Sequence, residues 1–100
     1  MTIQITKNND TITGALIGRL DTAASAQFAR DMMPLLDNAD KHIVLDCKDL
    51  EFVSSSGLRL FISLRKETIA KGGDVTITNV TPDVKKVFTI TGFYSLFNFE

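Results

Sequence analysis

Three consecutive serines, Ser54, Ser55 and Ser56, are the residues of this sequence best suited to chemistry. They stand where a helix is expected to begin, and the first N–H groups of a helix have no partner inside it. Ser54 is expected to cap that helix, because a serine side chain accepts such a hydrogen bond well. One side chain suffices as a cap, so the hydroxyls of Ser55 and Ser56 are candidates for another role.

A phosphate on Ser55 would meet the positive end of the helix dipole and free N–H groups, so the fold should tolerate it. Phosphorylation adds about −1.5 to −2 charges and would take the chain from −1 to about −3. Burying that dianion in an interface without an arginine partner costs several kcal/mol. About 4 kcal/mol corresponds to a thousandfold change in affinity, which is enough for a binding switch.

Catalysis by the serines is the competing hypothesis, and the sequence argues against it. A nucleophile elbow requires Gly-x-Ser-x-Gly, and no glycine lies two residues before Ser55 or Ser56. The only histidine, His42, is predicted to open a strand and to be structural, so a general base is hard to supply. Asp46 and Asp49 are interpreted as solvated residues at a strand end and in a loop, not as metal ligands. We therefore expect no enzymatic activity, no metal and no cofactor.

Composition predicts one domain, because 100 residues match the usual domain size of roughly 100–200 residues. Apolar residues make up 44% of the chain, and 11 basic residues balance 12 acidic ones. This balance gives no electrostatic reason to expect direct nucleic-acid binding or membrane insertion. A single cysteine, Cys47, cannot form an intrachain disulfide, and it is interpreted as a buried apolar residue. No signal segment and no run of 18 apolar residues is found, so a cytoplasmic location is expected.

The first half of the chain predicts a hairpin and then a helix. Ile3 and Ile5 alternate with polar residues, residues 8–10 have turn chemistry, and Thr11–Gly18 forms the returning strand. Thr22 is the predicted cap of the following helix. Pro34 predicts that this helix either kinks or stops near residue 33, with a separate short turn after it.

The central segment His42–Asp46 predicts a strand covered on both faces, because its apolar run does not alternate with polar residues. Residues 47–53 are expected to be a connection, and Ser54 then caps a helix that runs to about Lys71. Gly72 and Gly73 end that helix. Along it, Leu60 and Leu64 either pack under a neighbouring element or form an exposed apolar patch for a partner, rimmed by Arg59 and Lys66.

The last third predicts a strand, a helix and a strand. Val75 and Ile77 alternate with threonines, Thr81-Pro82-Asp83 spells a helix start, Gly92 ends that helix, and Leu96–Phe99 is a final short strand. The alternation after the hairpin requires right-handed crossovers and a largely parallel sheet. The expected fold is α/β, with a four- or five-stranded mixed sheet, an N-terminal β-hairpin and three to four helices.

At this point the sequence resembles the STAS domains, and among them the bacterial anti-sigma-factor antagonists. The similarity covers essentially the whole chain, as a single STAS domain at residues 1–100. Three segments carry it in this order and spacing: Gly18-Arg19-Leu20-Asp21, the stretch from Leu45-Asp46 to Gly57-Leu58, and Pro82 to Gly92.

The resemblance implies a partner-switching cycle. An unphosphorylated antagonist binds an anti-sigma factor, usually a serine kinase with an ATP-binding fold, and so frees a sigma factor for transcription. The kinase phosphorylates the antagonist and inactivates it, and a serine phosphatase reverses this. ATP and metal belong to those enzymes and not to the antagonist.

The resemblance also assigns the site residues. Matching Gly57-Leu58 to the family motif places the phosphorylated serine at Ser55, with Ser56 as a competing acceptor. Ser54 stands where the family usually has an aspartate, so the charge beside the acceptor is lost, and phosphorylation is expected to be slower or to use another enzyme. Asp21 matches an acidic position near the binding surface, or else it serves only as a helix-start acid. The implied partner-binding set is Asp21, Ser54, Ser55, Ser56, Gly57, Leu58, Arg59 and Leu60.

One alternative keeps the fold and removes the switch. In it the chain is a non-phosphorylated STAS subunit of a lipid-transport or signalling assembly.

Overall fold

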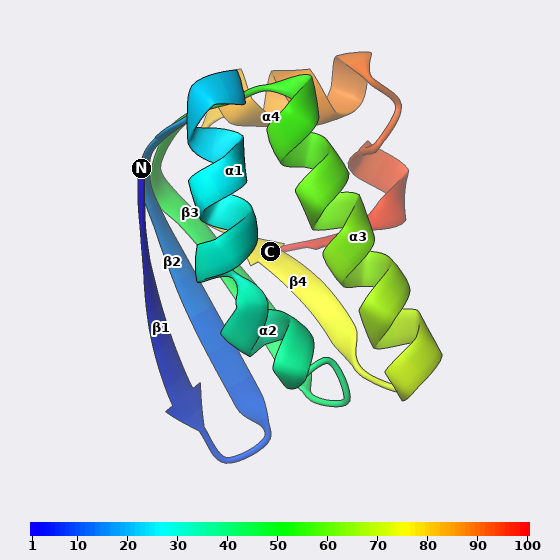
Figure 1. The fold of residues 1–100 in the computed structure, drawn as a ribbon. Helices are drawn as coiled ribbons and strands as arrows, with labels where there is room; N and C mark the ends of the chain where they lie inside the picture. Colours follow the sequence, from blue (N-terminus) through cyan, green and yellow to red (C-terminus); the bar gives the residue numbers. More distant parts are fainter.

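A five-stranded mixed sheet forms the centre of the computed structural model, which describes residues 1–100 (Figure 1). Its strands lie in the order β1-β2-β3-β4-β5, with β1 and β2 antiparallel and the other neighbours parallel. The element bounds are β1 (Thr2–Asn8), β2 (Thr11–Leu20), α1 (Thr22–Asp31), α2 (Met33–Asp37), β3 (His42–Val53), α3 (Ser55–Lys71), β4 (Asp74–Thr78), α4 (Pro82–Ile90), a 3-10 helix (Tyr94–Leu96) and β5 (Asn98–Phe99). The predicted fold class, with an opening hairpin and a mixed sheet, is confirmed.

The helices pack on one face of the sheet, as Figure 1 shows for α1, α2 and α3. Burial alternates along the central strand, where Ile43, Leu45 and Cys47 are buried and Val44 is only half-buried. The expectation that β3 is covered on both faces is therefore wrong. Val44 points to the opposite face, which carries half-buried threonines from β2 and β4, namely Thr11, Thr13, Thr76 and Thr78.

The central strand is also longer than predicted, because it continues through the residues expected to form a connection. The pairing of β2 with β3 is irregular at two places, between Ala15 and Ile17 and between Gly18 and Arg19. At each place β3 carries one more residue than β2, as a β-bulge does. The buried positions of β3 therefore shift from a spacing of two to a spacing of three, which brings Leu50 and Val53 into the core. This broken alternation made the segment look like a loop in the sequence.

The helix boundaries follow local chemistry. Pro34 separates α1 from the short α2, as its missing N–H and its ring predict, and Met32 lies between the two helices. Gly72 ends α3 with a left-handed φ of 87°. Thr81 caps α4 by accepting a hydrogen bond from the Val84 N–H at 3.3 Å. The final strand is shorter than expected, because residues 94–96 form a 3-10 turn.

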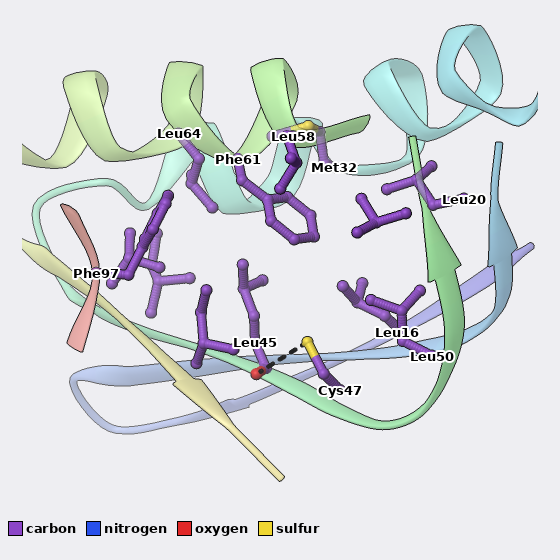
Figure 2. Packing of buried hydrophobic residues seen from close by; sticks show 14 of the residues in the cluster. Leu16, Leu20, Met32, Leu45, Cys47, Leu50, Leu58, Phe61, Leu64 and Phe97 are labelled. Carbon is purple, nitrogen blue, oxygen red and sulfur yellow. Dashed lines mark hydrogen bonds between the residues drawn. The ribbon is translucent and has the colours of Figure 1, made fainter. Parts of the chain in front are cut away.

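Side chains of the long helix α3 pack at the centre of the hydrophobic core. Phe61 is fully buried, with its ring centroid 6.0 Å from that of Phe28 on α1 and 6.0 Å from that of Phe88 on α4. Leu64 is also fully buried, so the packing hypothesis is confirmed for this residue, whereas Leu60 packs only partly against the core. Figure 2 shows Leu58, Phe61 and Leu64 of α3 reaching down to the sheet.

Cys47 lies inside β3 and points into the same core (Figure 2). Its thiol donates a long hydrogen bond to the Leu45 carbonyl, with Sγ 3.8 Å from the oxygen. Burial, with a smaller contribution from the charge of Asp46, raises the pKa of the Cys47 thiol from 9.0 to about 12. The interpretation of this cysteine as a buried apolar residue is confirmed, although it lies within the strand and not after it.

This burial makes Cys47 a reporter of unfolding. At pH 8 a thiol with this pKa is about one part in ten thousand thiolate, the form that reacts with alkylating reagents. We expect the native protein to resist a thiol-directed reagent and to react in urea at the unfolding midpoint. Mass spectrometry measures the labelled fraction, and rapid labelling without denaturant would show that β3 is not packed as described.

Candidate functional site

Two helices begin side by side at the end of the sheet where the parallel strands finish, which we call the carboxyl edge. Leu20 and Val53 are paired at the ends of the parallel strands β2 and β3, and each strand passes almost directly into a helix. The backbone N–H of Ser54 donates to the Leu20 carbonyl at 2.8 Å, so the pairing extends into the first turn of α3. The amino ends of α1 and α3 therefore open at the same edge, where parallel α/β sheets usually carry their sites.

The three serines differ in their burial and in the hydrogen bonds that they form within the chain. Ser54 caps α3, since its Oγ accepts a hydrogen bond from the Gly57 N–H at 3.1 Å. Ser55 is the first residue of the helix and is exposed, and its hydroxyl has no hydrogen bond within the chain. Ser56 is half-buried. Ser55 is therefore the hydroxyl of this run that is most available to another protein.

Asp21 is the cap of α1, not Thr22 as predicted from the sequence. Its Oδ1 accepts a hydrogen bond from the Ala24 N–H at 2.8 Å, and Thr22 is the first helical residue. A carboxylate fits this place because it meets the positive end of the helix dipole. The structural role considered for Asp21 is thus real, and it fixes a negative charge at the same sheet edge as the serine run.

Gly57 and Leu58 lie in the interior, not on a surface that a partner could touch. A Cβ atom on Gly57 would lie 2.7 Å from Cγ of Leu20 and 3.1 Å from Cγ2 of Val53, so only glycine allows α3 to approach β2 this closely. Leu58 is fully buried in the core. Both residues were expected in the partner-binding set, but their burial leaves no exposed side chain for a partner to contact.

Two exposed arginines, Arg19 and Arg59, lie on the elements that end or begin at this edge. Arg59 is exposed on α3, one helical turn after Ser55, and neither Arg59 nor Arg19 takes part in an ion pair. The guanidinium of Arg19 lies over the ring of Phe52, 4.7 Å from its centroid, at the end of the sheet. Leu60 is half-buried, so it offers only part of its side chain to a partner.

The sequence did not reveal the open cleft of about 560 Å³ at this edge, which includes Gly18, Asp49, Glu51 and Asp83 in its lining. It arises where the bulged part of β3 meets the start of α4, so pairing between distant segments creates it. Gly18 has a φ of 104°, a conformation that non-glycine residues rarely adopt. No three His, Cys, Asp or Glu residues are grouped so that they could hold a metal ion.

His42 lies at the other end of β3 from the serines. It begins β3, whereas Ser55 follows the end of the same strand, and its Nδ1 lies 2.9 Å from Oδ2 of Asp74. The imidazole is therefore engaged far from the serine hydroxyls. Asp46 is likewise committed, since its Oδ1 accepts hydrogen bonds from the Lys48 N–H and the Asn79 amide.

None of the helices is both long enough and apolar enough to span a lipid bilayer.

The chain belongs to the STAS domain family, whose model matches residues 2–100. A protein of Bordetella bronchiseptica named as an anti-sigma factor antagonist, BtrV, is 32% identical over 92 residues, covering 88% of this chain and 79% of that protein. The anti-sigma F factor antagonist of Paenibacillus polymyxa is 30% identical over 82 residues, covering 81% of this chain and 70% of that protein.

A solved structure of the anti-sigma factor antagonist SpoIIAA in its unphosphorylated form has the same fold. It superimposes with a TM-score of 0.79 at 24% identity and covers 99% of this chain and 88% of that one. The phosphorylated form of SpoIIAA from Bacillus gives a TM-score of 0.73, over 99% of this chain and 91% of that one.

The packing beneath the serines gives a direct test. Replacing Gly57 by alanine forces Leu20 or α3 to move, and such overpacking should cost about 1–3 kcal/mol of the free energy of unfolding. Ser55→Ala is the matched control, because it changes an exposed side chain and should alter stability by less than about 0.5 kcal/mol. Urea denaturation measures both values, and equal stabilities would contradict the described contact.

Proposed function

We propose that this protein is an anti-sigma factor antagonist whose binding is switched by phosphorylation of Ser55. In its unphosphorylated form it binds an anti-sigma factor and so releases a sigma factor for transcription. The observation that carries the proposal is the exposed, unbonded hydroxyl of Ser55 at the first turn of α3, next to Ser54, whose hydroxyl serves as the helix cap.

The relatives support the class of partner. Two curated relatives that are 30% identical or more bear the name of anti-sigma factor antagonist. SpoIIAA, which shares the fold, has been solved in both an unphosphorylated and a phosphorylated form. An antagonist that exists in two such forms suits a cycle in which one hydroxyl gains and loses a phosphate.

The geometry supports the switch because a phosphate on Ser55 would disturb a partner more than the domain. Oxygens attached there would lie near the free N–H groups at the amino end of α3, where negative charge is favourable. No element of the chain packs over the exposed Ser55, so the domain has nothing to displace. A docked partner that supplies no cation, in contrast, would have to bury an unpaired dianion, at a cost of several kcal/mol.

The partner-binding surface in this proposal consists of Asp21, Ser54, Ser55, Ser56, Arg59 and the exposed part of Leu60. The partners are an anti-sigma factor that is itself a serine kinase with an ATP-binding fold, and a serine phosphatase that restores the free hydroxyl. The protein binds and does not catalyse, because no imidazole lies near the serines to act as a base. ATP and metal would be held by the partner enzymes.

Ser54 favours one alternative, a non-phosphorylated STAS subunit of a lipid-transport or signalling assembly. As a neutral cap it accepts the Gly57 N–H and places no carboxylate beside the acceptor hydroxyl. If that carboxylate helps a kinase to orient the hydroxyl, its absence slows phosphorylation. The alternative therefore predicts a domain that binds a partner but gains no phosphate.

A phosphorylation assay separates the two. The protein is incubated with ATP and each anti-sigma serine kinase encoded in its source genome, and intact mass is recorded. We expect the gain of one phosphate, lost in Ser55→Ala and retained in Ser56→Ala. A phosphate that persists in Ser55→Ala would indicate Ser56 as the acceptor. A mass that no kinase increases would favour the alternative.

Binding of the same kinase gives the second measurement. Ser55→Asp should weaken the complex by about a hundredfold or more, because even one buried carboxylate without a partner costs about 3 kcal/mol. Ser55→Ala should bind as tightly as the unmodified protein and resist inactivation by ATP. Ser63→Asp is the matched control, since Ser63 is exposed two turns further along α3. Equal loss in both aspartate variants would contradict a switch located at Ser55.

A further inference from the structure

The free edge of β1 is the one feature of the molecule that is built for pairing with another strand. β1 is the outermost strand of the sheet and hydrogen-bonds to β2 on one side only. It pairs with β2 over all seven of its residues without a bulge, and six of the seven are exposed. An edge strand of this kind presents a row of unpaired backbone donors and acceptors.

Natural proteins usually protect such edges with proline, inward-pointing charges, bulges or very short strands. The opposite edge of this sheet follows that rule, because β5 consists of two residues. β1 has none of these devices between Thr2 and Thr6, and its only charged side chain is Lys7. In addition, Ile5 is 36% exposed, one of four large apolar side chains left on the surface.

The sequence of β1 is complementary to itself. Residues 2–6 read Thr-Ile-Gln-Ile-Thr, the same in both directions. When two copies of such a strand run antiparallel about Gln4, threonine faces threonine, isoleucine faces isoleucine and glutamine faces glutamine. Thr–Thr and β-branched pairs of this kind stabilise antiparallel strands, and no charged side chain is buried or placed opposite its own copy.

We propose that β1 is a self-association edge, through which two copies of this chain pair antiparallel about a twofold axis at Gln4. Ile5 of each copy would then pack beside Ile3 of the other, which already contacts the core. The assembly closes as a dimer, because each copy has one open β1 edge and the axis makes the contact isologous. A single strand pair falls below the roughly 1,200 Å² of standard interfaces, so the dimer is weak and reversible.

The twofold axis provides a sharp test, because Gln4 would face its own copy. Gln4 is exposed, so Gln4→Lys and Gln4→Glu leave the folded monomer intact but place like charges opposite each other in the dimer. Sedimentation is measured from about 10 μM to about 1 mM, the range of weak association. We expect the unmodified protein to dimerise with rising concentration, each variant to remain monomeric, and an equimolar mixture of the two variants to associate again.

Gln27→Lys is the matched control on α1, since Gln27 is also exposed and its side chain bonds only within that helix, and this variant should dimerise like the unmodified protein. A cross-link fixes the register: Gln4→Cys should form a disulfide-linked dimer on oxidation, whereas Gln27→Cys should not, and the buried Cys47 does not interfere. A monomer at all concentrations would overturn the proposal. So would a dimer that survives Gln4→Lys, or larger assemblies, which require a different surface.

Discussion

The contact between the first turn of α3 and the end of β2 is the constraint on which the candidate site depends. Gly57 lets the helix come so close that a methyl group would lie 2.7 Å from Leu20, and the Ser54 N–H extends the strand pairing to the Leu20 carbonyl. These two interactions fix the direction in which α3 leaves the sheet. They therefore decide that Ser55 emerges at the edge and is not covered by α1.

Neighbouring residues at this site have different structural roles. Ser54 and Asp21 each satisfy one open N–H group, of α3 and of α1 respectively, and Gly57 and Leu58 fill the space beneath. Ser55 is exposed and its hydroxyl forms no hydrogen bond within the chain. The proposed switch needs a rigid support, because a site that moved away from the phosphate would not transmit the repulsion to a partner.

The sheet carries helices on one face only. Two other parts of it are open to partners: the end where the parallel strands finish, and the free edge of β1. The carboxyl edge presents helix starts and mixed charges, which suit regulated binding. The β1 edge presents backbone groups and short neutral side chains, which suit pairing with a like strand. The two surfaces lie on different elements, and Figure 1 shows β1 and α3 towards opposite sides of the sheet, so one interaction does not require the other.

Local rules were sufficient to predict from the sequence the hairpin, the break at Pro34, the cap at Ser54, the end of α3 at Gly72 and the position of Ser55 at a helix start. Each of these depends on a few adjacent residues and on backbone chemistry that any surroundings would share. The length of β3, the one-sided cover of the sheet, the cleft beside Gly18 and the burial of Gly57 were decided by tertiary structure. They depend on which strand lies next to which, and a bulge becomes visible only when the partner strand shows that a residue is extra.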